Sequence, residues 1–391
     1  MTDFANGFDA LRKICACVLR GEPVPLALLS EPGFAEQGYA LAERHHVFPL
    51  VYAGLEAWKN AGAAPTPAAA NAWHRRMLVH ARKAIRYEQE LAALAARLAA
   101  AGVEFLAVKG PVLARQAYPV SVWRGYDDLD IRVRSKDLLA VVRILAERGY
   151  SRSVPLDARG AACARCAGIE VAMVNQDQAC FLDVAHGWRA LAPGRRAADE
   201  IWEEAVTLEI AGTRVRAPRP EHALLLACAH GAHHRWDRLV WVADVAGLWA
   251  RLAPAARTDA GALARRWRME TMLGLGLGLA AENLEATLDG RAAELSAAPR
   301  VRSLAPRVPL AQVAPDTPHD EPLIDCLRFE HDAQDTAFRR LRMKANWLCT
   351  PTLADIRETP LPSALYPLYA LIRPFRLLRH PWLRDWRKLA G

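Results

Sequence analysis

The 391-residue chain contains no long uninterrupted hydrophobic segment, although 52% of its residues are hydrophobic. The longest candidate, MLGLGLGLAA from Met272, is far shorter than the roughly 18 apolar residues that a membrane-spanning helix needs. The N-terminal residues MTDFANGFDALRKICACVLRG also lack the basic segment followed by an apolar one that a secretory signal would have. We therefore expect a cytoplasmic protein without a transmembrane segment.

Cysteine is present, but it does not form the pattern of a zinc or disulfide framework. The eight cysteines are scattered along the chain. Cys163-x-x-Cys166 is a single pair with no second pair at zinc-finger spacing, whereas structural zinc sites use four ligands. In the cytoplasm we expect most of these thiols to be reduced core residues, with a zinc or redox role of the pair as the alternative.

Acidic residues are scarce at the C-terminal end. From Arg339 to Gly391, eleven Lys or Arg stand against three Asp or Glu, and this excess equals the net charge of +8 of the whole chain. Aromatic residues such as Trp347, Tyr366 and Phe375 are interleaved with the basic ones. The segment predicts either a surface for an anionic partner (RNA, an acidic protein or a membrane surface) or an ordinary solvated helix with apolar anchors.

The most informative pattern lies in residues 103–133, VEFLAVKGPVLARQAYPVSVWRGYDDLDIRV. The apolar residues 105–108 predict a short buried strand, which ends at the KGP sequence of residues 109–111. Pro111 suits the first position of a helix, where its missing N–H costs nothing, so we expect a helix from there to about Tyr118.

An acidic strand follows in the sequence DDLDIRV. The period of two in a strand places Asp128 and Asp130 on one face and Leu129 and Ile131 on the other. Asp127 is expected to face away from the two carboxylates. Two carboxylates on one sheet face, beside a glycine turn that opens a helix, indicate a site for divalent metal and phosphate.

A strand, a glycine turn, a helix and an Asp-x-Asp strand in this order resemble the core of the polymerase-β-like nucleotidyltransferases. The segments LDVAHGW at 182–188 and LLLACAHGAHHRWDRLVWVADVAGL at 224–248 extend the likeness to a bacterial branch of uncharacterised, NTP_transf_5-type nucleotidyltransferases. The resemblance covers roughly residues 38–376. It implies an α+β fold in which a small mixed β-sheet forms the nucleotidyltransferase core, flanked by N-terminal and C-terminal helical regions.

The resemblance also implies a reaction and the residues that carry it. Asp128, Asp130 and Asp183, the last in a further predicted strand, would bind two Mg²⁺ ions and catalyse NMP transfer from an NTP to an unidentified hydroxyl or phosphate acceptor. Two such ions about 3.5–4 Å apart hold the attacking and leaving oxygens. His186, near the end of the same strand, is a further candidate for a direct role in the site. The alternative is a solvated acidic strand without a metal.

The phosphate site departs from the pattern of the superfamily. Lys109-Gly110 stands where many relatives have Gly-Ser, so a serine that would contact the triphosphate is missing. Lys109 can supply a positive charge, and backbone N–H groups after Gly110 can hold an anion. Arg124 is a second phosphate candidate, with a salt bridge to Asp127 or Asp128 as the structural alternative. The departure supports a second hypothesis, a non-catalytic nucleotide-binding or scaffold protein.

Histidines cluster in the sequence HGAHH. His230 and His234 share one face of a predicted helix, at the spacing of two-histidine metal sites, but Gly231 replaces the glutamate of the HExxH motif. The resemblance implies that the two histidines contact substrate or phosphate, or only orient the acidic strand. With His233, they also support a third hypothesis, a hydrolase that uses a transition metal.

Hydrophobic periodicity predicts three regions. Residues 274–278, GLGLG, lie in a helical apolar pattern with no preceding strand, so we reject a dinucleotide-binding motif. Residues 291–320 are rich in Pro, Ala and Arg without a clear period, and they predict an exposed connection. A β-hairpin is expected around Ala211-Gly212.

The three predicted regions are an N-terminal helical region at 1–98, the nucleotidyltransferase core at 99–217 and a C-terminal helical region with a basic end at 218–391.

Overall fold

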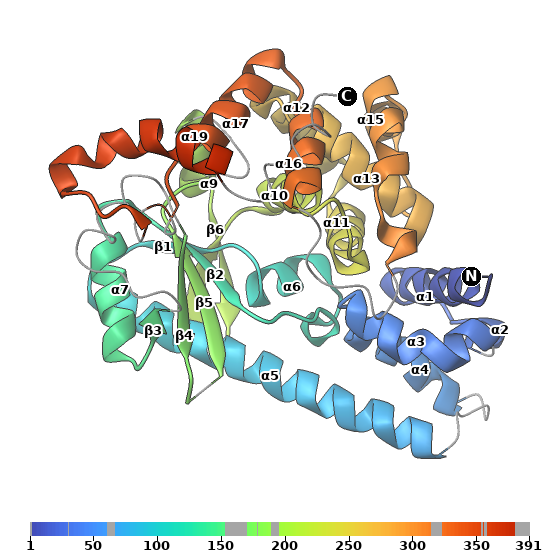
Figure 1. The fold of residues 1–391 in the computed structure, drawn as a ribbon. Coiled ribbons are helices and arrows are strands. Elements are labelled where there is room, and N and C mark those ends of the chain that lie inside the picture. The colour runs from blue at the N-terminus through green and yellow to red at the C-terminus, as the bar shows by residue number, and fades with distance from the viewer. Residues whose placement is uncertain are drawn as a thin grey trace.

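The computed structural model describes residues 2–29, 31–60, 67–152, 170–177, 179–188, 195–313, 323–352, 355 and 358–379. A five-stranded sheet lies among helices from both ends of the chain (Figure 1), so the predicted α+β class is confirmed. The Cys163-x-x-Cys166 pair and the last twelve residues lie outside the described residues. None of the helices in the described ranges has the length and apolarity to cross a membrane.

The sheet is small and mixed. Its strands run in the order β1-β2-β5-β4-β3, and β2 and β5 are parallel whereas the other neighbours are antiparallel. Leu129, Ile131 and Val133 of β2 are buried, as expected for a strand in the middle of a sheet. The strands are β1 (Phe105–Ala107), β2 (Leu129–Val133), β3 (Ser151–Arg152), β4 (Val171–Asn175) and β5 (Cys180–Ala185).

The N-terminal helices include one of 34 residues, α5, which runs along the sheet and continues beneath the other N-terminal helices (Figure 1). Its buried residues Tyr87, Leu91, Leu94 and Leu98 recur at helical spacing and pack in the core of the sheet. Gly102, with φ of 67°, follows the helix. The helices are α1 (Thr2–Arg20), α2 (Leu26–Leu29), α3 (Pro32–Arg44), α4 (Phe48–Asn60) and α5 (Pro67–Ala100).

The core region contains short connecting helices and a hairpin. Ala211 and Gly212 form the expected two-residue hairpin turn, both with positive φ (46° and 75°), which suits a type I′ turn. The elements are α6 (Pro111–Ala117), η1 (Ser121–Trp123), α7 (Leu138–Glu147), α9 (Arg195–Glu203), β6 (Val206–Ile210) and β7 (Thr213–Ala217).

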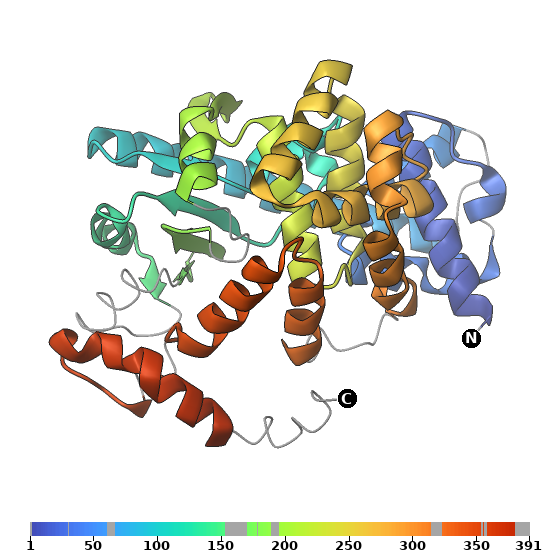
Figure 2. The ribbon, with the colours of Figure 1, turned by 90° about the horizontal axis from the view of Figure 1, so that it is seen from above.

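The C-terminal helices pack on α6 and on the N-terminal helix α1, and the last one, α19, extends away from the body (Figure 2). The first ones are α10 (Pro220–His233), α11 (Leu239–Arg251), α12 (Pro254–Trp267), α13 (Glu270–Leu284), α14 (Gly290–Ser296) and α15 (Pro299–Leu304). The later ones are η2 (Ala305–Arg307), η3 (Leu310–Gln312), α16 (Leu323–Asp332), α17 (Ala337–Cys349), η4 (Ser363–Leu368) and α19 (Tyr369–Arg379).

The prediction of an exposed connection at 291–320 is wrong where the structure describes it. Helices α14 and α15 lie there and bury Leu295, Val301 and Leu304. Each helix has only six or seven residues, fewer than two turns, so no period shows in the sequence. The rejection of the GLGLG motif is confirmed, because these residues lie inside helix α13.

Two hydrophobic cores hold the molecule together. One contains α5, the sheet and the hairpin. The other joins the N-terminal helices to the C-terminal helices, so the predicted regions 1–98 and 218–391 share a core. Helix α11 packs closely on the end of α6: a Cβ at Gly247 would lie 2.1 Å from the carbonyl oxygen of Ala117. This contact positions the segment that leads into β2.

Several basic residues of the C-terminal end bind other parts of the protein. Arg339 is buried and donates to the carbonyl oxygen of Arg268 at 2.7 Å. Arg373 and Arg376 both donate to the buried Asp355, which fixes α19 against the preceding segment. These arginines stabilise the fold, and an anionic partner at this end stays a prediction.

Candidate active site

The two central strands bring the predicted carboxylates together. Asp130 on β2 and Asp183 on β5 are paired residues on adjacent parallel strands, so they lie side by side. Asp128 precedes Asp130 by two residues, at the entrance of β2. Asp130 is only 3% exposed, and its Oδ2 atom has no hydrogen-bond partner among the described residues. The sheet therefore gathers three acidic side chains, one of them with an unsatisfied buried oxygen.

The electrostatics of this cluster show excess negative charge. Burial raises the pKa of Asp183 to about 7, and repulsion from Glu170, Asp130 and Asp128 adds to this rise. Burial and repulsion from Asp130 likewise raise the pKa of Asp128. Burial also acts to raise the pKa of Asp130, but the neighbouring cations, Lys109 first, outweigh it and lower that pKa. Because the pKa values of Asp183 and Asp128 stay raised in spite of Lys109 and the nearby arginines, the cluster favours a further cation.

Lys109 and Gly110 lie directly beside the acidic strand. Lys109 Nζ donates to Asp130 Oδ1 at 3.1 Å. Gly110 adopts φ of 56°, in the left-handed region, and an added Cβ would lie 3.3 Å from the carbonyl oxygen of Asp128. Glycine is needed here because a side chain would be strained and would crowd the acidic strand. The KG sequence thus brings an ammonium group to the carboxylates.

Arg124 has a partner that the sequence did not indicate. Its Nε and Nη2 atoms donate to Oδ1 and Oδ2 of Asp244 at 2.7 and 2.9 Å. The hydroxyl of Tyr118 donates to the same carboxylate at 2.9 Å. Arg124 therefore forms a salt bridge, but the predicted partner, Asp127 or Asp128, is wrong. The three buried side chains tie the segment before β2 to helix α11, which is a structural role.

Asp127 faces away from the carboxylate pair. Its carboxylate pairs with Lys83 of α5 and lies 3.4 Å from His46 Nδ1. Its side chain is 61% exposed, in contrast to the 2% of Asp130. The alternation predicted for the acidic strand is confirmed.

His230 and His234 lie on one face at the end of α10, as the spacing predicts. Their rings are 4.7 Å apart, and the ring of His234 stacks on Trp241 at 4.9 Å. Burial holds the pKa of His230 well below its ordinary value, and the charge of Lys109 contributes. Burial, His233 and Lys109 lower the pKa of His234 to about 3. Both imidazoles are therefore neutral at pH 7, and they share the electrostatic neighbourhood of Lys109.

His233 differs from its two neighbours because it has an acidic partner. Its Nδ1 atom lies 2.8 Å from Oε2 of Glu330 on α16. Burial acts to lower the pKa of His233, but the hydrogen bond and charge of Glu330 outweigh it and raise that pKa. The pair joins the histidine segment to the C-terminal helices.

The donor set suits Mg²⁺, although it does not form a ready metal cage. Among the described residues, no three His, Cys, Asp or Glu side chains are placed so that they could hold a metal ion. Carboxylate oxygens are nevertheless the ligands that Mg²⁺ prefers, and substrate phosphates ordinarily supply part of its coordination. The unsatisfied Oδ2 of Asp130 and the excess negative charge fit such an ion. The hydrolase hypothesis gains no support from the histidines.

The chain matches the family model described as "uncharacterised nucleotidyltransferase" over residues 35–285, which is more than half of its length. The chain belongs to this nucleotidyltransferase family. The match begins in α3, includes both acidic strands and the histidine segment, and reaches just beyond α13. No curated protein matches the chain.

The remaining residue considered for the site, His186, lies just beyond the end of β5. It lines a cavity of about 390 Å³ together with Arg134, Trp202 and Arg342. Its Nε2 atom is buried without a hydrogen-bond partner among the described residues. His186 belongs to the end of the sheet, and its contacts give it no direct place beside Asp128 or Asp130.

Sequence reasoning missed Glu330 and the partner of Arg124. Glu330 lies 97 residues after His233, in a helix without a recognised motif. Asp244 lies 120 residues after Arg124. The spacing along the chain carries no sign of either pair. One local signal could have been used: Asp244 is the charged residue in the apolar pattern VWVADVAGL, and a buried aspartate needs a cation as its partner.

Proposed function

We propose that the protein transfers NMP from an NTP to a hydroxyl or phosphate group of an acceptor in a reaction that depends on Mg²⁺. The observation that carries this proposal is the pairing of Asp130 with Asp183 on adjacent parallel strands, with Asp128 two residues before. The family membership gives the reaction class. The excess negative charge of the three carboxylates supports the need for metal.

Each residue has a role in this proposal. Asp128 and Asp130 would hold the metal ions, and Asp183 would complete the metal site. Bound Mg²⁺ neutralises charge that develops on the attacking and leaving oxygens. Lys109 is close enough to exchange its ion pair with Asp130 for one with a phosphate. His230 and His234, both neutral, can donate or accept a hydrogen bond at the substrate without adding charge.

A second candidate function is nucleotide binding without turnover. The specific observation in its favour is the Lys109-Gly110 pair, which stands where many relatives have Gly-Ser and whose lysine forms an ion pair with Asp130. A lysine that stayed on Asp130 would compete with a metal ion for the same oxygen atoms. The two candidates share nucleotide binding and differ in pyrophosphate release.

Thermal unfolding in the presence of the four NTPs, with and without Mg²⁺, tests the shared part. A ligand at about 100 times its dissociation constant stabilises a protein by about 2.7 kcal/mol, which a melting curve resolves. We expect one NTP to raise the melting temperature of the wild type only with Mg²⁺, and to leave the double variant Asp128→Ala/Asp130→Ala unmoved. Asp127→Ala is the matched control, because this neighbouring carboxylate faces away.

The outcome separates three cases. A shift together with pyrophosphate release in the presence of an acceptor mixture supports transfer, and Asp128→Ala should then abolish the release. A shift with no release under any acceptor tested supports the binding protein. A folded wild type that no Mg²⁺–NTP stabilises contradicts both.

A further inference from the structure

A cavity lies on the side of the acidic strand to which Asp127 points. It has a volume of about 490 Å³ and lies between α3, α4, α5 and residues 125–127. Asp127 at its edge directly precedes Asp128, so the cavity borders the proposed site of transfer. Pockets for small molecules have volumes of about 300–1,000 Å³, so this cavity has the size of a ligand site.

Arg44 is the residue of this cavity that most needs a further partner. Its side chain is only 2% exposed, and it forms one ion pair, from Nη2 to Oδ2 of Asp237 at 3.3 Å. Its Nε and Nη1 atoms are buried without a hydrogen-bond partner among the described residues. A buried guanidinium with unsatisfied donors is costly, and native proteins ordinarily satisfy such groups. An anion beside Arg44 would reduce this cost.

The other basic residues of the cavity differ in how firmly they are held. Arg76 is fully engaged, since its Nε and Nη2 atoms bind both carboxylate oxygens of Glu43 at 2.7 and 2.6 Å. Lys83 forms an ion pair with Asp127, whose side chain is 61% exposed. Such an exposed pair is weak, and Lys83 can turn to another anion at little cost. Lys83 is therefore the cation that a ligand can contact, and the buried Arg44 adds its positive charge behind the wall of the cavity.

His46 lies at the edge of the cavity between a cation and an anion. Its Nε2 atom is 3.1 Å from Nη1 of Arg238, and its Nδ1 atom is 3.4 Å from Oδ2 of Asp127. The charged side chains that line the cavity are Arg44, Arg76, Lys83, Glu43 and Asp127. With Asp237, the partner of Arg44, three carboxylates match the three cations, so an anion would bind by taking the place of one of these carboxylates.

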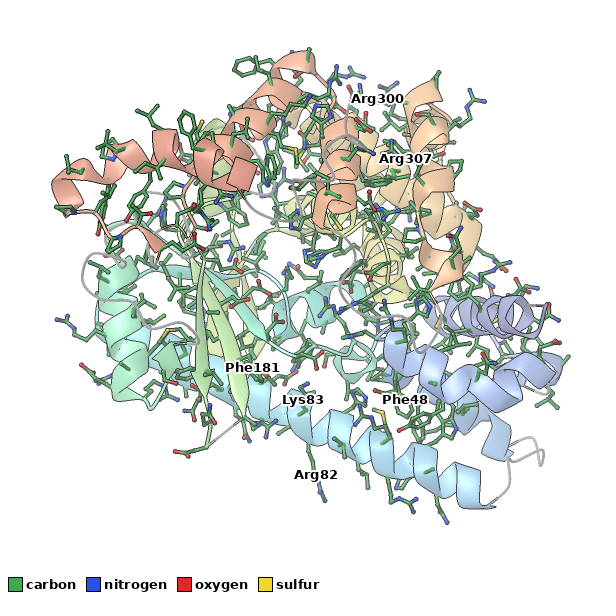
Figure 3. The ribbon with its side chains drawn as sticks, viewed as in Figure 1. Phe48, Arg82, Lys83, Phe181, Arg300 and Arg307 are labelled. Atoms are coloured by element: carbon green, nitrogen blue, oxygen red, sulfur yellow. The ribbon has the colours of Figure 1, made fainter. Side chains whose placement is uncertain are left out.

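The side chains on α5 show which way this helix faces the cavity. Figure 3 shows Lys83 directed from α5 toward the interior, on the side of Phe48, whereas the preceding Arg82 points away from the body. Phe48 and Val79 add apolar surface to the lining. The cavity therefore combines an accessible cation, Lys83, with an apolar wall, which is a usual composition of a site for a small organic anion.

We propose that this cavity binds a small molecule through an oxyanion group, a phosphate or a carboxylate, which Lys83 contacts and the charge of the buried Arg44 attracts.

Isothermal titration of the full chain with inorganic phosphate, and separately with succinate, tests the binding site without any turnover. We expect at least one of the two anions to bind, and Lys83→Met to weaken that binding by roughly tenfold to a hundredfold, the loss expected for one hydrogen bond from a charged donor. Arg82→Met removes the same charge from the adjacent position of α5 and should leave the affinity unchanged. Lys83→Arg keeps the positive charge and should retain most of the wild-type affinity that Lys83→Met loses.

Three results would overturn the proposal: no binding of either anion by the folded wild type, equal weakening by Arg82→Met, or weakening by Lys109→Met but not by Lys83→Met. The last result would place the anion at the nucleotide side. Circular dichroism of each variant shows that it is folded, and Arg44→Lys serves as the second variant in the cavity. Because nucleotide binding is measured separately, a cavity that binds phosphate in a protein that binds no NTP would contradict the proposed function alone.

Discussion

Two buried charged clusters flank the short segment that leads from α6 into β2, and they are balanced in opposite ways. In the first, Asp244 accepts two hydrogen bonds from Arg124 and one from Tyr118, so both of its oxygen atoms are satisfied. In the second, Asp130 lies beside Asp183 and accepts a hydrogen bond from Lys109, Arg132 and Arg124 act on it only through their charges, and one oxygen of Asp130 has no partner among the described residues.

The difference separates a structural cluster from a functional one. A buried ion pair with every donor and acceptor satisfied fixes two elements relative to each other. A buried cluster with excess charge lowers stability and persists where a ligand or ion completes it. By this criterion Arg124 anchors the chain, whereas Asp128, Asp130 and Asp183 have the charge balance expected of the proposed site. The fully paired Arg76 and the half-paired Arg44 show the same contrast in the neighbouring cavity.

The largest expected effect comes from breaking the balanced cluster. Asp244→Asn leaves the buried guanidinium of Arg124 without its carboxylate, and we expect a loss of about 3–5 kcal/mol in the free energy of unfolding. Denaturant unfolding followed by circular dichroism measures it. The double variant Arg124→Met/Asp244→Leu removes both charges and should recover much of the loss. A loss below about 1 kcal/mol in the single variant would contradict the structural role of the pair.

A smaller change in the free energy of unfolding, of opposite sign, is expected from a substitution in the cluster of Asp128, Asp130 and Asp183. The pKa of Asp183 in the folded protein is raised to about 7, above its ordinary value of 3.8. Folding therefore loses stability as the pH rises from about 4 to about 7, and the full penalty is present above pH 7. Because Asp183→Asn removes the charge at this position, the variant should be more stable than the wild type at pH 8. The expected difference in the free energy of unfolding is about 1–2 kcal/mol after allowance for partial solvent exposure.

The pH dependence provides the control for Asp183→Asn. Near pH 4 the wild-type carboxyl group is largely protonated in the folded state, so the two proteins should have nearly equal stability. Thermal unfolding of both proteins in buffers between pH 4 and pH 8 gives the difference. A variant that is less stable than the wild type throughout this range would show that Asp183 is a structural residue.

The parts of the fold that sequence could predict depend on local patterns. The strand period of DDLDIRV placed Asp128 and Asp130 on one face and Asp127 on the other, and the structure confirms this. The Ala211-Gly212 turn and the long helix α5 are equally local. Helices α14 and α15 were missed because six or seven residues contain too few apolar positions to show a period.

The parts of the site that could not be predicted depend on pairs far apart in the chain. The resemblance supplied Asp183, but nothing local indicated that Arg124 binds Asp244 or that His233 binds Glu330. The cavity was missed for the same reason, since its basic lining comes from α3 and α5. Charge balance is a property of the packed structure, so sequence could name the charged residues but could not show which of them are compensated.

The smallest expected effect tests a pair that is intermediate between the two clusters. His233, whose side chain is 35% exposed, pairs with the buried Glu330, and its pKa in the folded protein is raised. The stabilisation by this pair is therefore fully present below the unfolded pKa of about 6.5 and is lost as the pH rises through the folded pKa. We expect Glu330→Gln to cost about 0.5 kcal/mol at pH 5.5. Above pH 8 the cost should vanish or change sign, because the variant then removes a buried charge whose partner is neutral. Matched thermal unfolding at the two pH values measures the difference, and a cost that grows with pH would show that Glu330 compensates another cation of the site, not His233.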